Sequence, residues 1–274
     1  MGLHENRRLR RGGAIALGLL TVVTTGALTA SPAMAATNAT VAVNTNSLGK
    51  SLSYNGGTGN SSNLKIFLEA GEVTVTDTVA LSTGTGCRIV ATGKARCGAS
   101  INTMLVQLGD GTDAAEVSVN TAGQVFGDAG DDTLSAGRTG SAGVTYSGGF
   151  GFDTVSYSRS AGGVNVTLDD AANDGRLIGS FNGKDNVRDD VERLSGSELA
   201  DRLTGDERRN DILGLGGVDT INPGTNVDNV IGGNGDDVFS IRDQFVDTLN
   251  GGAGFDTATV DRSFDSLTLV ESIS

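Results

Sequence analysis

The sequence GGNGDD at residues 232–237 and the sequence GGAGFD at residues 251–256 are two copies of one hexapeptide, with glycine at positions one, two and four and aspartate at position six. A third copy, GGFGFD, occupies residues 148–153, and GDAGDD at residues 127–132 differs at one of those positions. Glycine admits backbone angles closed to other residues, so such a segment can turn tightly and direct its carbonyl oxygens towards one point, where the aspartate adds a carboxylate. Oxygen-only ligands of this kind suit calcium.

The hexapeptide belongs to a longer period of nine residues, with one step of ten, in the second half of the chain. The sixth positions of successive nonapeptides are Glu192, Asp201, Asn210, Asp219, Asp228, Asp237, Asp247 and Asp256. The eighth positions are all apolar: Leu194, Leu203, Ile212, Ile221, Val230, Phe239, Leu249 and Ala258. An apolar column at a fixed period predicts stacked strands that bury one face.

The nonapeptide Gly-Gly-Xaa-Gly-Xaa-Asp-Xaa-apolar-Xaa resembles the calcium-binding repeat of RTX-type (haemolysin-type) proteins over residues 109–259. The resemblance implies a parallel β-roll in which two nonapeptides make one coil and calcium lies between successive turns. The carboxylates that would bind calcium are Asp113, Asp132, Asp153, Asp201, Asp219, Asp237 and Asp256. Backbone carbonyls would come from the turns at Gly127, Gly130, Gly148, Gly149, Gly151, Gly214, Gly217, Gly232, Gly233, Gly235, Gly251, Gly252 and Gly254.

If two nonapeptides make one coil, alternate repeats fall on opposite sides of the roll. In the second half, one side carries Asp201, Asp219, Asp237 and Asp256 and keeps most of its glycines. The turns of the other side have all lost the fourth glycine, at residues 187–192, 205–210, 223–228 and 242–247. We therefore expect one calcium-loaded edge and one degenerate edge, and in the first half Asp113, Asp132 and Asp153 again occupy one edge only.

The spacing also predicts an interruption of the roll. Asp153 and Asp201 are separated by 48 positions where one coil needs 18, which indicates an insertion at residues 160–190 between a first roll segment at 109–159 and a second at 191–260. The insertion contains a β segment at 164–168 and an acidic loop at 169–175. The loop does not fit an EF-hand, because Phe181 stands where a bidentate glutamate is required. A solvated loop and an additional cation site both stay open.

Residues 36–108 alternate apolar and polar side chains in short segments separated by Gly, Asn, Ser and Thr. This pattern predicts an N-terminal antiparallel β domain, which resembles what precedes such repeats in secreted actinobacterial proteins. Cys87 and Cys97 are the two cysteines of the chain and are expected to form a disulfide in an exported protein. Residues 261–274 are expected to cap the open end of the roll. The predicted fold is all-β throughout.

Residues 1–35 have the features of a signal peptide: four arginines, an apolar run from Ala14 to Ala30 and the small-residue site Ala33-Met34-Ala35. The sequence therefore predicts a secreted, extracellular protein, by the general secretory or the twin-arginine route. No later segment is apolar enough to span a bilayer. A membrane anchor is the alternative interpretation of the apolar run.

Composition excludes several classes of function. Removing residues 1–35 would take four of the 20 basic residues and one of the 33 acidic ones, leaving a net charge of about −16, which excludes a nucleic-acid-binding protein. It would also remove His4, the one histidine, and with it histidine-based catalysis and histidine zinc ligands. Neither a Gly-Xaa-Ser-Xaa-Gly elbow nor a His-Glu-Xaa-Xaa-His motif is present.

These observations predict a secreted calcium-binding protein without catalytic activity, whose roll folds or rigidifies when it binds Ca²⁺. One alternative is a polysaccharide lyase or epimerase built on the β-solenoid with carboxylates as acid and base. Another is a cell-surface adhesin or scaffold, with a cell-wall or polysaccharide partner that the sequence does not name.

Overall fold

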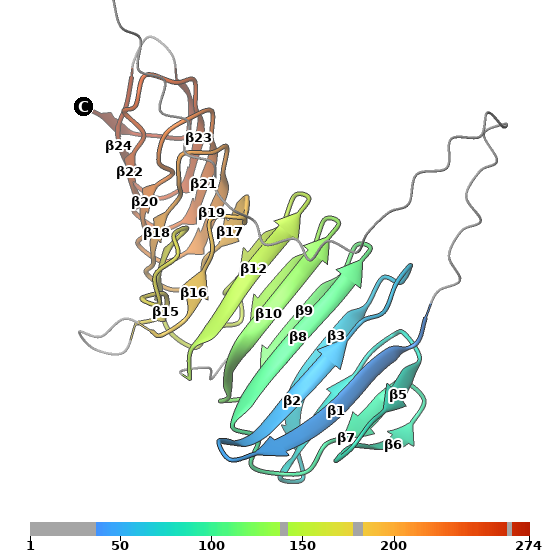
Figure 1. Cartoon of the computed structure of the whole chain (residues 1–274). Coiled ribbons are helices and arrows are strands. Elements are labelled where there is room, and N and C mark those ends of the chain that lie inside the picture. Colours follow the sequence, from blue (N-terminus) through green and yellow to red (C-terminus); the bar gives the residue numbers. More distant parts are fainter. Residues whose placement is uncertain (1–36, 138–141, 178–182, 262–264) are drawn as a thin grey trace, which may run out of the picture. The chain divides into compact units, whose positions relative to one another are not determined.

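The computed structural model describes residues 37–137, 142–177, 183–261 and 265–274, and every structural statement below concerns these residues. The predicted signal peptide, residues 1–35, lies outside them. All regular elements in the described ranges are β-strands, which confirms the all-β prediction (Figure 1). Within those ranges no helix exists that is long and apolar enough to cross a membrane.

The strands form three sheets, which we name A, B and C. Sheet A contains, in spatial order, β16 (Asn186–Val187), β12 (Val144–Phe150), β10 (Ala122–Ala129), β8 (Thr103–Asp110), β2 (Gly49–Asn55), β1 (Ala39–Asn46) and β5 (Leu81–Thr83). Sheet B contains β25 (Ser266–Thr268), β23 (Thr248–Ala253), β21 (Asn229–Asn234), β19 (Asp211–Gly216), β17 (Arg193–Ser195), β13 (Thr154–Ser156), β11 (Thr133–Ala136), β9 (Ala114–Ser118), β3 (Asn63–Glu69), β4 (Glu72–Thr76), β7 (Lys94–Arg96) and β6 (Arg88–Ala91). Sheet C contains β15 (Gly175–Arg176), β14 (Val164–Thr167), β18 (Arg202–Thr204), β20 (Thr220–Asn222), β22 (Val238–Ser240), β24 (Thr257–Thr259) and β26 (Ser272–Ile273).

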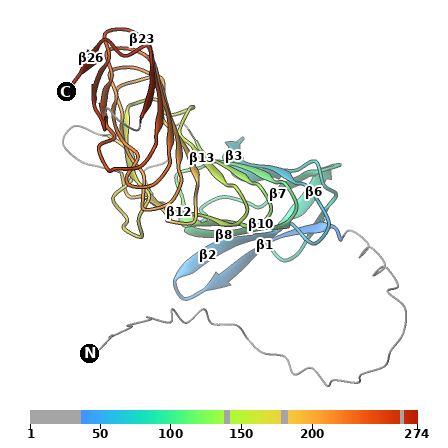
Figure 2. The ribbon, with the colours of Figure 1, turned by 90° about the horizontal axis from the view of Figure 1, so that it is seen from above.

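Successive strands alternate between two sheets, so that the chain winds in coils. From β8 to β13 the chain alternates between sheets A and B, and from β17 to β26 it alternates between sheets B and C. Within each sheet these strands pair in parallel with the strand one coil away, as the stacked coils of Figure 2 show. Parallel stacking of this kind is consistent with a β-solenoid or β-roll.

The apolar column expected from the nonapeptide period is buried and divides between two sheets. Leu194, Ile212, Val230 and Leu249 face one another along sheet B, and Leu203, Ile221, Phe239 and Ala258 do so along sheet C. All eight are at most 3% exposed. Because successive side chains of a strand point to opposite faces, one apolar residue in each short strand is enough to form this core.

The N-terminal strands combine antiparallel hairpins with parallel edges. The pairs β1–β2, β3–β4, β4–β7 and β6–β7 are antiparallel. However, β2 pairs in parallel with β8, and β3 with β9, so sheets A and B run on from the hairpins into the coils. A disulfide joins Cys87 and Cys97 at the base of the β6–β7 hairpin, as the sequence predicts.

The segment at residues 160–190 starts a new sheet. Its strand β14 pairs in parallel with β18 in sheet C, while β16 returns to sheet A beside β12. As a result Glu192, rather than Asp201, takes the place one coil after Asp153: β13 pairs with β17, and Val155 lies opposite Leu194. The spacing in the sequence instead predicts that Asp201 lies one coil after Asp153; this prediction is wrong, because a count of residues does not reveal which of two sheets a strand joins.

Candidate metal sites in the acidic turns

Carboxylates stack along two columns, each formed by the residues that directly precede the strands of one sheet. The column before sheet B, the B column, consists of Asp113, Asp132, Asp153, Glu192, Asn210, Asp228, Asp247 and Asp265. The column before sheet C, the C column, consists of Asp201, Asp219, Asp237, Asp256 and Glu271. Parallel pairing one coil apart brings these residues beside one another, although they are 15 or more positions apart in sequence.

A hydrogen bond from backbone to side chain connects most neighbours within a column. In the C column, the N–H of Asp219 donates to Asp237 Oδ1, and the N–H of Asp237 donates to Asp256 Oδ1, both at 2.8 Å. In the B column, the N–H of Asp113 donates to Asp132 Oδ1 at 2.8 Å, and that of Asp132 to Asp153 Oδ1 at 2.9 Å. Each carboxylate thus uses one oxygen to hold the preceding coil.

The second carboxylate oxygen has no hydrogen-bond partner in eight of these aspartates. The unpartnered atoms are Oδ2 of Asp113, Asp132, Asp153, Asp228 and Asp247 in the B column and of Asp219, Asp237 and Asp256 in the C column. The eight residues are at most 2% exposed, and within the described ranges none of them forms an ion pair with a basic side chain. Burying a charge without a partner is costly, so a bound cation would supply the missing counter-charge.

The first glycine of each glycine-rich turn leaves space for this oxygen. A Cβ on Gly232 would lie 2.4 Å from Asp237 Oδ2 and 2.4 Å from the carbonyl oxygen of Gly251 in the next coil. A Cβ on Gly127 would similarly meet Asp132 Oδ2 at 2.3 Å and the Gly148 carbonyl oxygen at 2.5 Å. The turn therefore brings a carboxylate oxygen and a carbonyl oxygen of successive coils to one point, which is the ligand chemistry that calcium uses.

The fourth glycine allows the turns to stack backbone against backbone. Gly235 has φ of +136°, and a Cβ there would lie 1.5 Å from the carbonyl oxygen of Gly217 in the preceding coil. The second position also stacks closely, since a Cβ on Gly233 would lie 2.2 Å from the carbonyl oxygen of Leu215. Asp128 and Leu215 occupy this position with φ of 73° and 77°, whereas Gly233 has φ of +115°. Loss of the second glycine in those two turns is therefore accompanied by a change in φ that stays within the positive range.

The predicted carboxylates fall into three groups. Asp113, Asp132 and Asp153 stack in the B column, and Asp219, Asp237 and Asp256 stack in the C column, so the glycine-rich turns precede sheet B in the first half and sheet C in the second. Asp201 also lies in the C column but has both oxygens occupied: Oδ2 accepts from the N–H of Ser197 at 2.5 Å, and Oδ1 from the N–H of Val164 at 2.7 Å. Asp201 is thus the weakest candidate ligand of the seven.

Sequence analysis missed two residues with the same geometry. Asp228 and Asp247 are buried, stack in the B column and carry an unpartnered Oδ2, although their turns lack the fourth glycine. Their sixth position in the nonapeptide was visible in the sequence. The loss of the fourth glycine concealed their role, because an aspartate without the full motif does not distinguish a buried ligand from a solvated turn residue.

Burial raises the pKa of the stacked carboxyl groups. Loss of hydration is the first cause and neighbouring carboxylates add to it; the pKa reaches about 7 at Asp132, Asp219 and Asp228 and about 6 at Asp153, Asp237 and Asp247. The hydrogen bond from the N–H of the preceding coil acts in the opposite direction at each of them. Without a cation these groups ionise only as the pH approaches neutrality, and a cation that binds at lower pH must displace protons.

Comparison with known proteins gives no match, either to protein-family models or among curated proteins. The relationship to RTX-type proteins therefore stays a prediction carried by the nonapeptide. Function is inferred from the residues and geometry of this chain alone.

Replacing Gly235 by alanine is expected to lower the melting temperature for two reasons. The new Cβ would clash with the carbonyl oxygen of Gly217, and the alanine would have to adopt a positive φ. The conformational strain alone costs about 1–3 kcal/mol. Gly98→Ala is the matched control, since Gly98 has φ of +75° but open space around its Cβ position. Thermal unfolding followed by circular dichroism should show a clearly larger decrease for Gly235→Ala; equal decreases would contradict the stacking argument.

The calcium-free protein is expected to lose stability as pH rises from about 4 to about 7. The folded-state pKa values of Asp132, Asp219 and Asp228 lie above the ordinary value of 3.8, so the folded state binds more protons in this window than the unfolded state does. Stability is therefore highest at the acid end and falls as these groups ionise. Melting temperatures in calcium-free buffers across this range test the sign, and a rise towards pH 7 would refute it.

Proposed function

We propose that this protein is a secreted calcium-binding protein in which Ca²⁺ bound at the glycine-rich turns stabilises a parallel β-roll. The observation that carries the proposal is the set of buried carboxylate oxygens that have no partner. In each glycine-rich turn such an oxygen lies close to a carbonyl oxygen of the next coil. Calcium accepts oxygen ligands of both kinds and tolerates irregular geometry, whereas Mg²⁺ demands a near-ideal octahedron.

The proposed sites lie between successive carboxylates of a column. They pair Asp113 with Asp132, Asp132 with Asp153, Asp219 with Asp237, and Asp237 with Asp256. Each ion would neutralise two stacked carboxylates and fix two turns together. For a dissociation constant of about 0.1 mM at about 1 mM calcium, linkage gives roughly 1.4 kcal/mol per site. Four such sites add about 5–6 kcal/mol, which is comparable to the whole stability of a small domain.

Two features support an extracellular location. The Cys87–Cys97 disulfide is typical of proteins in oxidising compartments. The predicted signal peptide at residues 1–35 would direct the chain out of the cytosol. In a compartment rich in calcium the carboxylate columns would be neutralised, whereas at low calcium their mutual repulsion would keep the coils loose.

Asp174 and Asp185 are buried carboxylates outside the columns and have a structural role. Asp174 accepts hydrogen bonds from the N–H groups of Thr167 and Val187, both at 2.8 Å, and so connects β14 to β16. Asp185 accepts from the N–H of Val144 at 2.9 Å and from the Tyr157 hydroxyl at 3.2 Å. With all four oxygens occupied by protein donors, this pair offers no free acid or base, which favours a binding role over a lyase or epimerase.

The proposal is tested by calorimetric titration of the purified protein with calcium, together with circular dichroism. We expect at least two equivalents to bind with a gain of β signal. Asp237→Ala should remove about two sites, because Asp237 lies between Asp219 and Asp256.

Asp236→Ala is the matched control for this experiment. Asp236 is adjacent in sequence and carries the same charge, but it is exposed and lies outside the column. The control should therefore keep the wild-type stoichiometry. Absence of binding at millimolar calcium, or an equal loss in both variants, would refute the proposal.

A further inference from the structure

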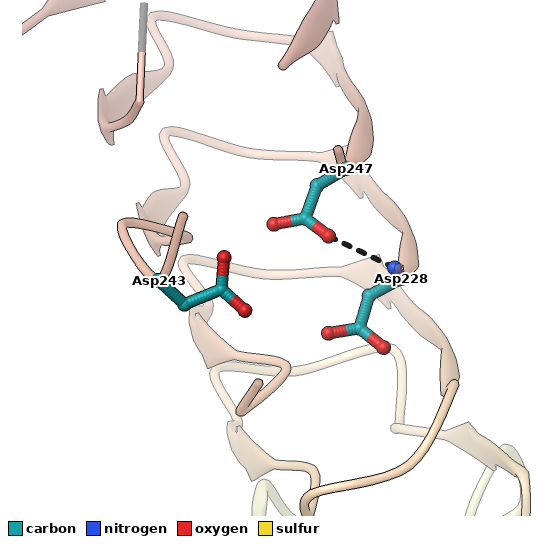
Figure 3. A group of neighbouring side chains, drawn as sticks. All are labelled: Asp228, Asp243 and Asp247. Carbon is teal, nitrogen blue, oxygen red and sulfur yellow. Dashed lines mark hydrogen bonds between the residues drawn. The ribbon is translucent and has the colours of Figure 1, made fainter. Parts of the chain in front are cut away.

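Three carboxylates lie close together in the turns that lead from sheet C to sheet B, which lack the fourth glycine of the motif. Asp228, Asp243 and Asp247 each place one oxygen within 4.8 Å of the others (Figure 3). No other group of three potential metal-binding side chains lies this close within the described part of the chain. Asp228 and Asp247 are 2% and 0% exposed, and Asp243 is half-buried.

Hydrogen bonds fix these carboxylates in place but leave ligand oxygens free. The N–H of Asp228 donates to Asp247 Oδ1 at 2.8 Å, and Asp228 Oδ1 accepts from the N–H of Asn210 at 2.8 Å. The remaining oxygen, Oδ2, of both Asp228 and Asp247 is buried and has no partner. In Figure 3 a free oxygen of each points towards the side on which Asp243 lies. Two buried, unpartnered carboxylate oxygens therefore face the space beside Asp243.

Asp243 is held on the opposite side of this space by its own turn. Its Oδ1 accepts from the N–H of Phe245 and its Oδ2 from the N–H of Asn226, both at 2.9 Å. A carboxylate oxygen has a second lone pair, so these bonds leave capacity for a cation. The neighbouring Arg242 does not neutralise the group, because its guanidinium donates to the carbonyl oxygens of Val260 and Ser274.

The surroundings add further negative charge. Asp206, Asp261 and Asp265 lie near enough to affect Asp228 or Asp247 electrostatically. Among the described residues no basic side chain forms an ion pair with any of the three clustered carboxylates. An all-oxygen, strongly negative site of this kind selects a hard divalent cation.

The kind of ligand favours calcium over magnesium. Calcium accepts six to eight oxygen ligands in irregular geometry, whereas Mg²⁺ demands a near-ideal octahedron and is held by one or two carboxylates with several retained waters. Three carboxylates from two successive turns suit the less demanding ion.

We propose that Asp228, Asp243 and Asp247 form a further calcium site, which uses carboxylates where the glycine-rich turns use backbone carbonyls. Asp243 occupies the second position of its hexapeptide, a glycine in the intact motif, so the aspartate there supplies the third carboxylate of the site. More ligand charge strengthens calcium binding. This site is therefore expected to bind more tightly than a glycine-rich turn, and it does not depend on those turns for its ligands.

The test is calcium titration of the purified chain and of Asp243→Asn. Asparagine keeps the size of the side chain but only one acceptor oxygen, so it loses one of the two backbone hydrogen bonds of Asp243. Because Asp243 is half-buried and not in the core, the fold should persist in circular dichroism. We expect the loss of the tightest equivalent or at least a tenfold increase in its dissociation constant. Asp236→Asn is the control, because Asp236 likewise accepts a backbone N–H, from Phe255 at 2.8 Å, without facing a cluster.

Asp247→Asn provides a second readout that a purely structural role would not give. Removal of a buried, unpartnered charge should raise the melting temperature in chelator, while the variant gains less than the wild type when calcium is added. A decreased melting temperature in chelator, together with an unchanged number of calcium equivalents in both variants, would overturn the proposal.

The design separates this site from the glycine-rich turns. Loss of one equivalent in Asp243→Asn with no effect of Asp237→Ala would support the carboxylate cluster and refute the glycine-turn sites. The opposite pattern would refute the cluster alone, and absence of calcium binding in the wild type would refute both.

Discussion

Most neighbouring coils of this protein are joined by a hydrogen bond from a backbone N–H to the carboxylate one coil further on. This bond determines how the turns stack and which carboxylate oxygen stays without a partner. The bond at Asp237 uses one carboxylate oxygen and leaves the other buried against the next turn. Repetition of the bond places like charges in a column with little water to screen them. The same residue that aligns the coils thus creates the need for a cation.

Glycine is needed in these turns because the stacked coils leave no space for a Cβ. At the first position it makes room for the free carboxylate oxygen, and at the fourth it allows one carbonyl to approach the backbone of the next coil, as at Gly232 and Gly235. The second position combines positive φ with a close carbonyl of the preceding coil, as at Gly233, yet Leu215 and Asp128 also adopt a positive φ there. Two turns of the roll thus form with a side chain at the second position.

Much of this was predictable from the sequence because the nonapeptide period records burial directly: Ile212, Ile221 and Phe239 lie in the core as their spacing indicates. The period does not record sheet membership. Sheet C begins at β14, inside a segment that looks like an insertion, and this shifts Glu192 into line with Asp153. The period also does not identify Asp243 as a candidate ligand. In the sequence, an aspartate in place of a glycine looks like loss of the motif, and only the fold shows that Asp228 and Asp247 lie beside it.

Dependence on calcium should differ along the chain, because the coils differ in what else stabilises them. The coils built on sheet A have strands of seven or eight residues, continue from antiparallel hairpins and lie in the same sheets as the disulfide-linked β6–β7 hairpin. The strands of sheet C from β18 to β24 have three residues each and bury one apolar side chain, while acidic columns line both of their edges. In a stacked repeat, stability is approximately a sum over neighbouring coils. The least apolar burial and the most unneutralised charge therefore coincide in the coils after β17, so calcium bound as we propose would contribute most to the order of those coils.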